Sequence, residues 1–400
     1  MPSSRCRNTK NSDSMSLLIK NVLLDGRKCN LLVLDGRFEC MDASDNAEAE
    51  HVLDGSGTAI LPAFYNTHTH AAMTLLRGYG DDNPLHVWLK EYVWPYEDKL
   101  TAEDIRRGSE LAVREMISTG TVFFNDMYFD IDETVEIVRE KGIRASIGVT
   151  IMDYHPKALR EEKENLIRSW RDSESVRLAA APHAVYTVGR DNLISTARLA
   201  RENGRKLHIH LAETRKEVQD CLAQTGMTPV RYLDSIGFLG PDVIAAHCVH
   251  VDKEEWDILA ERGVTVSHCP CSNMKLGSGR FPYELAIASG VRVTIGTDGC
   301  SSNNNLDMRE EMKIAALLAK VTGDAALLSA SQVFEWATRN GAEAFGFDAG
   351  VIAKGKLADA ILVSLDSIKM QPCHNLISNW VYSADSSCIK HVICNGKVLL

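Results

Sequence analysis

Eight apolar runs that alternate with amphipathic segments occupy the middle of the chain, and this alternation most constrains the fold. The segments between the runs, such as 101–116 and 190–204, carry apolar residues at helical spacing. Alternating strands and helices predict an α/β protein with a parallel sheet covered by helices. Eight strands in succession favour closure into a (β/α)8 barrel of the TIM type over an open doubly wound sheet, which would place a glycine-rich turn after its first strand. The predicted strands are 59–70, 121–128, 144–152, 176–187, 206–213, 243–250, 264–273 and 291–299.

The two ends of the chain have a different pattern. Residues 16–59 and 355–400 contain short β runs separated by Asp-Gly and Asn-Gly, which favour tight hairpin turns. We expect these ends to pair into one small β-sandwich domain, with residues 60–354 forming the barrel that carries the catalytic site. Residues 1–14 are polar and are expected to be a disordered lead-in.

Composition and charge exclude several classes of protein. The 400 residues are 45% hydrophobic and 24% charged, which is typical of a globular protein. The formal net charge of −10 disfavours a nucleic-acid partner. No apolar stretch is long enough to span a membrane, and the N-terminus lacks the apolar core of a secretory signal. The 11 scattered cysteines contain no CxxC pair, so we expect free thiols in a cytoplasmic protein, which we also expect to be a homo-oligomer.

Two histidines, His68 and His70, lie one residue apart at the end of the first predicted barrel strand. Residues i and i+2 of a strand point to the same face, so both rings project into one space. A buried imidazole pair is costly unless each ring finds hydrogen-bond partners or a metal. Taken alone, the pair fits two interpretations equally well. The histidines are either core residues bonded to backbone carbonyls or one half of a metal site.

Polar residues at the ends of other predicted strands favour the metal site. In barrels of this kind, functional residues lie at the C-terminal ends of the strands. His68, His70, His210 and Asp298 form a ligand set suited to one divalent transition metal, typically Zn²⁺, which lowers the pKa of a bound water to about 7. Glu213 follows in the loop above the site and is placed to move protons, and His247 is placed to orient hydroxide or stabilise negative charge. We expect His208 to lie one layer deeper, in the core or behind the ligands.

The motifs NTHTH, HLAET, AAHCVH, SHCPCSNMKLGSG and GTDGCSSNN, in this order, resemble those of the amidohydrolase superfamily, and within it the 5-methylthioadenosine/S-adenosylhomocysteine deaminases. The resemblance covers 16–400 and implies a mononuclear zinc site. It implies that Glu213 carries a proton to a purine ring nitrogen, that Asp298 takes one from the metal-bound water, and that His247 holds the attacking oxygen. It also implies substrate contacts, with Glu97 at the ribose hydroxyls, His183 near the sugar and Trp88 in the pocket wall.

The expected reaction is therefore hydrolytic deamination of a small-molecule purine nucleoside to the inosine analogue and ammonia. Adenosine, 5′-deoxyadenosine and 5′-methylthioadenosine are the expected substrates. Whether S-adenosylhomocysteine is also a substrate is left open. The resemblance implies an arginine that binds its carboxylate, but Gly148 and Val149 occupy the expected position, and Arg160 is the residue that could replace it. The alternative is a ring deaminase or dechlorinase of the same superfamily acting on guanine, a pterin or an s-triazine. A non-catalytic relative would have lost metal ligands, and none is missing here.

Overall fold

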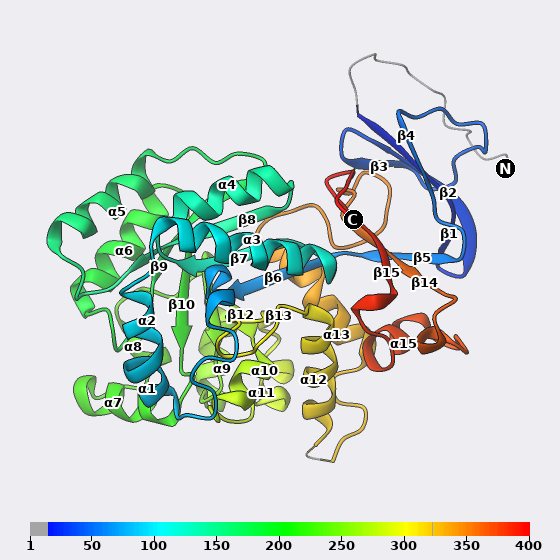
Figure 1. The fold of residues 1–400 in the computed structure, drawn as a ribbon. Coiled ribbons are helices and arrows are strands. Elements are labelled where there is room, and N and C mark those ends of the chain that lie inside the picture. Colours follow the sequence, from blue (N-terminus) through cyan, green and yellow to red (C-terminus); the bar gives the residue numbers. More distant parts are fainter. Residues whose placement is uncertain (1–14, 322) are drawn as a thin grey trace. The chain divides into compact units, whose positions relative to one another are not determined.

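The computed structural model describes residues 15–321 and 323–400, so the expectation for residues 1–14 lies outside the described residues. The described chain divides into two compact units (Figure 1). The barrel unit comprises residues 66–115 and 123–329, apart from residue 322. The end unit comprises 15–65, 116–122 and 330–400.

An eight-stranded sheet whose strands follow one another in chain order, from β6 to β13, builds the barrel. Neighbouring strands with a described register run parallel, and the first and last strands are linked as well, because the Thr67 hydroxyl donates to the Ile295 carbonyl at 3.0 Å. The predicted (β/α)8 barrel is thus confirmed. The strands are β6 (Phe64–Thr69), β7 (Thr121–Tyr128), β8 (Arg144–Ile151), β9 (Val176–Pro182), β10 (Lys206–Leu211), β11 (Val243–His247), β12 (Thr265–His268) and β13 (Arg292–Ile295).

The predicted strand 59–70 is two strands in different sheets. Residues Thr58–Pro62 form β5, which pairs with strands of the end unit, and β6 begins at Phe64. Pro62 has no N–H to donate to a ladder, and this favours an interruption at that point. Apolar content alone does not distinguish one long buried strand from two short ones.

Helices cover the barrel where the amphipathic segments predict them. At the start of α3, Thr101 and Asp104 exchange hydrogen bonds. The Thr101 N–H donates to the Asp104 carboxylate, and the Asp104 N–H donates to the Thr101 hydroxyl. The helices of four or more residues are α2 (Trp94–Glu97), α3 (Ala102–Ser118), α4 (Ile131–Lys141), α5 (Lys157–Ser169), α6 (Arg190–Glu202), α7 (Arg215–Thr225), α8 (Pro229–Ser235), α9 (Lys253–Glu261), α10 (Pro270–Lys275), α11 (Tyr283–Ser289), α12 (Met308–Lys320), α13 (Ala330–Ala337), α14 (Arg339–Ala344) and α15 (Leu376–Tyr382). The described chain also contains the three-residue α-helix α1 (Leu85–Val87), the π-helix η2 (Trp88–Val93), and the 3-10 helices η1 (Ala71–Leu76), η3 (Ile368–Met370) and η4 (Ser386–Cys388).

The end unit contains a second sheet, drawn from both chain ends as the sequence predicts, together with α13, α14 and α15. The order of the sheet is β16-β15-β14-β5-β1-β2-β3, and β4 pairs with β1. Asp25-Gly26, Asp35-Gly36 and Asn395-Gly396 have positive φ at both residues, which matches the twist of tight hairpins. The remaining strands are β1 (Ser16–Leu24), β2 (Arg27–Leu34), β3 (Arg37–Cys40), β4 (His51–Asp54), β14 (Ala360–Ser364), β15 (Ile389–Cys394) and β16 (Lys397–Val398).

Among the described residues, no helix combines the length and the apolar character that crossing a lipid bilayer requires.

Candidate active site

Three histidines and one aspartate converge at the C-terminal ends of the barrel strands. His68 and His70 come from the end of β6, His210 from β10, and Asp298 from the loop after β13. One ligand atom from each of the four lies within 4.8 Å of the others. Asp298 Oδ1 lies 3.3 Å from His68 Nε2 and 3.1 Å from His70 Nε2, and the Nε2 atoms of His70 and His210 are 3.3 Å apart. The four residues predicted as metal ligands are therefore brought together.

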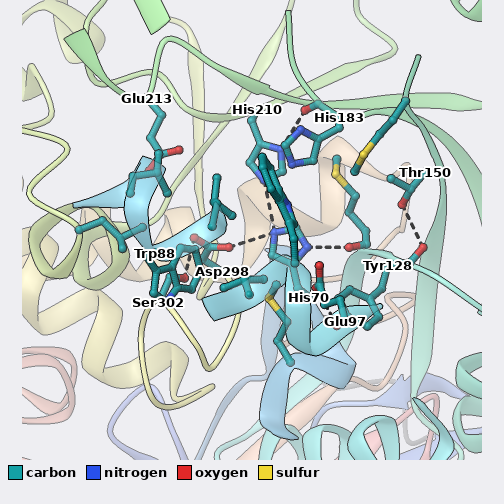
Figure 2. Close-up of a pocket in the computed structure, with 18 of the residues that line it drawn as sticks. His70, Trp88, Glu97, Tyr128, Thr150, His183, His210, Glu213, Asp298 and Ser302 are labelled. Carbon is teal, nitrogen blue, oxygen red and sulfur yellow. Dashed lines mark hydrogen bonds and ion pairs between the residues drawn. The ribbon is translucent and has the colours of Figure 1, made fainter. Parts of the chain in front are cut away.

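Hydrogen bonds on the far side of the rings orient two of these histidines. His70 Nδ1 lies 2.6 Å from the Met127 carbonyl, and His210 Nδ1 lies 2.9 Å from the His183 carbonyl. Because a carbonyl only accepts, Nδ1 carries the proton in each ring and the Nε2 lone pair faces the group. Figure 2 shows the bonds that hold these rings in place.

His68 lies deepest in the group. Its Nδ1 is 2.8 Å from Nε2 of His208, which places His208 behind the group as expected, and its own Nε2 has no hydrogen-bond partner among the described residues. Burial lowers the pKa of His68 to about 4, so the ring is neutral near pH 7. A buried, neutral imidazole nitrogen without a partner has the properties of a metal ligand.

The carboxylate of Asp298 is held in place by two hydroxyls. Oδ2 accepts hydrogen bonds from Ser272 at 2.6 Å and Ser302 at 2.9 Å, which leaves Oδ1 directed at the histidines. Burial opposes ionisation, but contacts with His68 and His70 outweigh it and hold the pKa of Asp298 well below its usual range. Neither serine was predicted as a site residue, although Ser272 lies within the motif SHCPCSNMKLGSG and Ser302 within GTDGCSSNN.

Glu213 and His247 lie beside this group. Glu213 Oε1 accepts a hydrogen bond from the Ser278 hydroxyl at 2.9 Å, and Oε2 lies 4.0 Å from His247 Nε2. His247 ends β11 with a φ of 72° and is buried, with Nδ1 2.8 Å from Asn273 Oδ1. With Nδ1 donating to the amide oxygen, Nε2 is left as an acceptor. Ser278 and Asn273 were also not predicted, since their roles depend on how α10 and the segment after it fold over the site.

A pocket opens above the group, within the barrel unit. All of the residues predicted for the site except His68, which lies beneath it, line this pocket. Figure 2 labels seven of them in the pocket wall: His70, Trp88, Glu97, His183, His210, Glu213 and Asp298. It also labels Ser302, which lines the pocket and was not predicted.

The predicted substrate-binding residues surround the ligand group. Glu97, at the end of α2, accepts a hydrogen bond from the Tyr128 hydroxyl at 2.8 Å, and burial raises its pKa to about 7. His183 follows β9 directly, and its Nδ1 lies 3.0 Å from the Thr187 hydroxyl. Burial lowers the pKa of His183 to about 3, so this ring is also neutral. Trp88 is buried at the start of η2, and its indole N–H has no partner among the described residues.

One side of the pocket is apolar and lacks cationic groups. Met127, Phe129 and Met152 line it at the ends of β7 and β8, and none of the described lining residues is a lysine or an arginine. At position 148 an added Cβ would lie 2.6 Å from the Asp126 carbonyl oxygen, so Gly148 leaves no room for a side chain. Arg160 on α5 is not among the lining residues.

Comparisons with known proteins place these observations in a family. The model of the amidohydrolase family matches residues 59–399. The chain is 49% identical over 358 residues to 5-methylthioadenosine/S-adenosylhomocysteine deaminase 1 of Archaeoglobus fulgidus, with 88% of this chain and 85% of that protein covered. It is 44% identical over 400 residues to the 5′-deoxyadenosine deaminase of Methanosphaera stadtmanae, with 97% and 94% covered.

A solved structure is similar over nearly the whole chain. The zinc-bound adenosine deaminase of Xanthomonas campestris superposes with a TM-score of 0.89 at 35% sequence identity, and the match covers 96% of this chain and 92% of that one. The barrel and the converging histidines agree with these relationships. The chain belongs to the amidohydrolase family.

Proposed function

We propose that this chain is a metal-dependent deaminase of adenine nucleosides, a hydrolase that replaces the C6 amino group with oxygen and releases ammonia. The observation that carries the proposal is the His68, His70, His210 and Asp298 group, which lies beside Glu213 and His247 at the base of a pocket. The names of the relatives, which are deaminases of adenosine derivatives, support the same substrate class.

The four converging residues fit one divalent metal ion, and we assign Zn²⁺. Three imidazole nitrogens and one carboxylate oxygen are a ligand set that zinc accepts, and the buried Nε2 of His68, which makes no hydrogen bond in the described chain, fits a metal ligand. A divalent cation held there acts as a Lewis acid, and it makes water a nucleophile near neutral pH.

The surrounding side chains supply the proton transfers. Asp298 accepts a proton from the attacking water, and its position is fixed by Ser272 and Ser302. Glu213 delivers a proton to ring nitrogen N1, so that negative charge does not accumulate on the purine as water adds to C6. His247 accepts a hydrogen bond from the attacking oxygen through Nε2. Asp298 then passes the proton that it accepted to the amino group, Glu213 takes back a proton from the C6 hydroxyl, and the C6–N bond breaks to leave a C6 carbonyl and release ammonia.

The sugar lies on the side of Glu97 and His183. The Glu97 carboxylate accepts hydrogen bonds from the ribose hydroxyls, and the hydroxyl of Tyr128 orients it. Trp88 offers its free indole N–H and its ring face to the nucleoside.

The wall near the ends of β7 and β8 favours an uncharged 5′ substituent. Met127, Phe129 and Met152 are suited to a 5′-methyl or methylthio group. The amino-acid tail of S-adenosylhomocysteine carries a carboxylate, and no lining lysine or arginine in the described chain pairs with it. We therefore assign 5′-deoxyadenosine and 5′-methylthioadenosine as preferred substrates over S-adenosylhomocysteine.

The test is a deamination assay. Zinc-loaded protein is incubated with adenosine, 5′-deoxyadenosine, 5′-methylthioadenosine and S-adenosylhomocysteine, and the loss of adenine absorbance is followed together with ammonia release. Turnover of at least one nucleoside that stops on substitution of Glu213→Gln supports the proposal. Failure to deaminate any of the four rejects the substrate class.

A further inference from the structure

The loop that carries Glu213 is attached to the next helix in an unusual way. Glu217, on the first turn of α7, accepts two hydrogen bonds from successive backbone N–H groups. Its Oε1 accepts from Ala212 and its Oε2 from Glu213, each at 2.8 Å. All three residues are buried. Ala212 has a φ of 49°, in the left-handed region that residues other than glycine, asparagine and aspartate rarely adopt.

The normal role of a glutamate at this helix position is different. In a capping box, the third residue of the helix returns to the N–H of the capping residue. Glu255 does this at the start of α9, where it accepts the Asp252 N–H at 3.0 Å. At the start of α7, the Thr214 hydroxyl accepts the Glu217 N–H at 3.2 Å. The Glu217 carboxylate, however, bonds to the N–H groups of Ala212 and Glu213, the two residues before Thr214, and not to the N–H of Thr214. Helix capping therefore does not account for the placement of the Glu217 carboxylate.

The bonded backbone is the part of the chain that aims Glu213 at the pocket. Successive N–H groups around a left-handed residue form a concave donor pair that suits an acidic group, and here the carboxyl group of Glu217 occupies it. Ala212 also accepts the His250 N–H at 2.9 Å, so the loop after β11 is tied to it. The side chain of Glu217 lies on the backbone of Glu213, while that of Glu213 faces Ser278 and His247.

We propose that Glu217 is a positioning residue for the deamination reaction, because it holds the Ala212–Glu213 backbone in the conformation that directs the Glu213 carboxylate at the substrate. The inference rests on the proposed function, in which Glu213 carries the proton. Glu217 touches neither the substrate nor the four metal-ligating residues. Its loss changes the rate of proton delivery more than the binding of the nucleoside or the metal.

The principal variant is Glu217→Gln, in which one of the two oxygen acceptors becomes an NH₂ group that faces a backbone N–H. We expect kcat for 5′-deoxyadenosine to fall about 10- to 100-fold and KM to change by less than about threefold, since a small misplacement of a reacting group acts on the chemical step. Metal content by elemental analysis should equal that of the wild type.

Glu255→Gln is the matched control. It also removes a buried carboxylate from the first turn of a helix in the barrel unit, but its partners Asp252 and Thr228 do not line the pocket. Its thermal midpoint should fall, while kcat stays within about twofold of the wild type. Equal losses of kcat in the two variants would show a general effect of helix stability and overturn the proposal.

A second substitution tests the mechanism through the backbone. Glycine adopts the left-handed conformation freely, so Ala212→Gly removes the conformational cost that Glu217 offsets. In the Ala212→Gly/Glu217→Gln double variant, kcat should recover at least about threefold over Glu217→Gln alone. No recovery contradicts positioning through this backbone.

If Glu217→Gln does not fold, the variant Glu217→Asp provides the test. Glu217→Asp keeps the charge and both acceptors but is one methylene shorter, and its kcat is expected to fall with KM unchanged. Wild-type kcat in this variant, or in Glu217→Gln, overturns the inference. A wild-type protein that deaminates no nucleoside rejects the proposed function instead, so the two failures are distinguishable.

Discussion

The Nε2 atom of His68 lies 3.3 Å from Oδ1 of Asp298, and the backbone N–H of Asp298 donates to the His68 carbonyl at 3.0 Å. His68 belongs to β6, the first strand of the barrel, and Asp298 follows β13, the last one. The contact that closes the barrel between its first and last strands therefore also assembles the ligand group. Loss of either residue should affect both metal binding and stability.

The first prediction concerns metal removal. The purified protein should contain about one equivalent of a divalent metal per chain, and chelation should abolish deamination. Metal bound only by the folded state should raise the unfolding free energy by about 2.7 kcal/mol at 100 times its dissociation constant. Elemental analysis and thermal unfolding with and without added Zn²⁺ measure both effects. A His210→Ala variant with the metal content and melting temperature of the wild type would contradict the assigned group.

The second prediction concerns the hydroxyls that hold Asp298. Ser272→Ala removes the donor 2.6 Å from Oδ2 and should weaken metal affinity about 10- to 100-fold, which is typical of residues that orient a ligand. Ser267→Ala is the matched control, because Ser267 is equally buried but bonds to Thr67 in the barrel interior. Competition with a chelator of known affinity gives the metal dissociation constants. Equal affinities in the two variants would argue against a role for Ser272.

The third prediction separates nucleosides from free bases. A charge-assisted hydrogen bond contributes about 1.5–3 kcal/mol, so Glu97→Ala should lower kcat/KM for adenosine about 10- to 100-fold. Activity on free adenine, however low, should change by less than about threefold, because the base makes no contact at the ribose position. Steady-state kinetics on both substrates provide the measurement. Equal losses on both would place Glu97 at the base instead of the sugar.

The fourth prediction concerns the 5′ substituent. We expect kcat/KM for 5′-deoxyadenosine and 5′-methylthioadenosine to exceed that for S-adenosylhomocysteine at least about tenfold, because desolvating a carboxylate without a partner costs more than 1.4 kcal/mol. Met152→Arg should lower the ratio of kcat/KM for 5′-deoxyadenosine to that for S-adenosylhomocysteine, because it places a cation for the carboxylate in the apolar pocket wall. Met152→Leu, which keeps the wall apolar, should preserve it. A wild-type enzyme that prefers S-adenosylhomocysteine would refute this assignment.

The fifth prediction concerns pH and stability. Glu311 on α12 is buried and accepts hydrogen bonds from the Cys271 N–H and the Asn303 side chain, and burial raises its pKa from 4.5 to about 8. The folded state therefore binds this proton more tightly than the unfolded state does. The contribution of Glu311 to unfolding free energy is highest below pH 4.5 and falls as the pH rises to about 8, by about 1.4 kcal/mol per unit of pKa difference.

The neutral variant Glu311→Gln lacks this titration. Urea midpoints measured at several pH values between 5 and 8 should fall more steeply for the wild type than for the variant. Parallel midpoint curves would show that the Glu311 carboxyl does not change its protonation on unfolding in this range.

Much of the architecture follows from local sequence patterns. Helix α3, which begins after Thr101, and helix α4, which ends before Gly142, carry apolar faces and capping residues. The Asp-Gly and Asn-Gly pairs form the predicted hairpins. The division of 59–70 into two strands was not predicted, because periodicity does not reveal which sheet a buried segment joins.

By itself, the sequence determined the barrel, the sheet from both chain ends and the residues that could bind a metal, since strand alternation and the position of polar residues at strand ends are properties of neighbours along the chain. Only the tertiary structure decided which side chains form the hydrogen bonds that hold those residues in place. Ser272 and Ser302 bond to Asp298, Ser278 bonds to Glu213, and Glu217 bonds to the backbone that carries Glu213. The contacts of Ser272 and Ser278 join segments 26 and 65 residues apart, and those of Ser302 and Glu217 join residues only four apart. All four form where loops and helix starts fold over the strand ends, and such irregular backbone has no periodicity from which the contacts could be predicted.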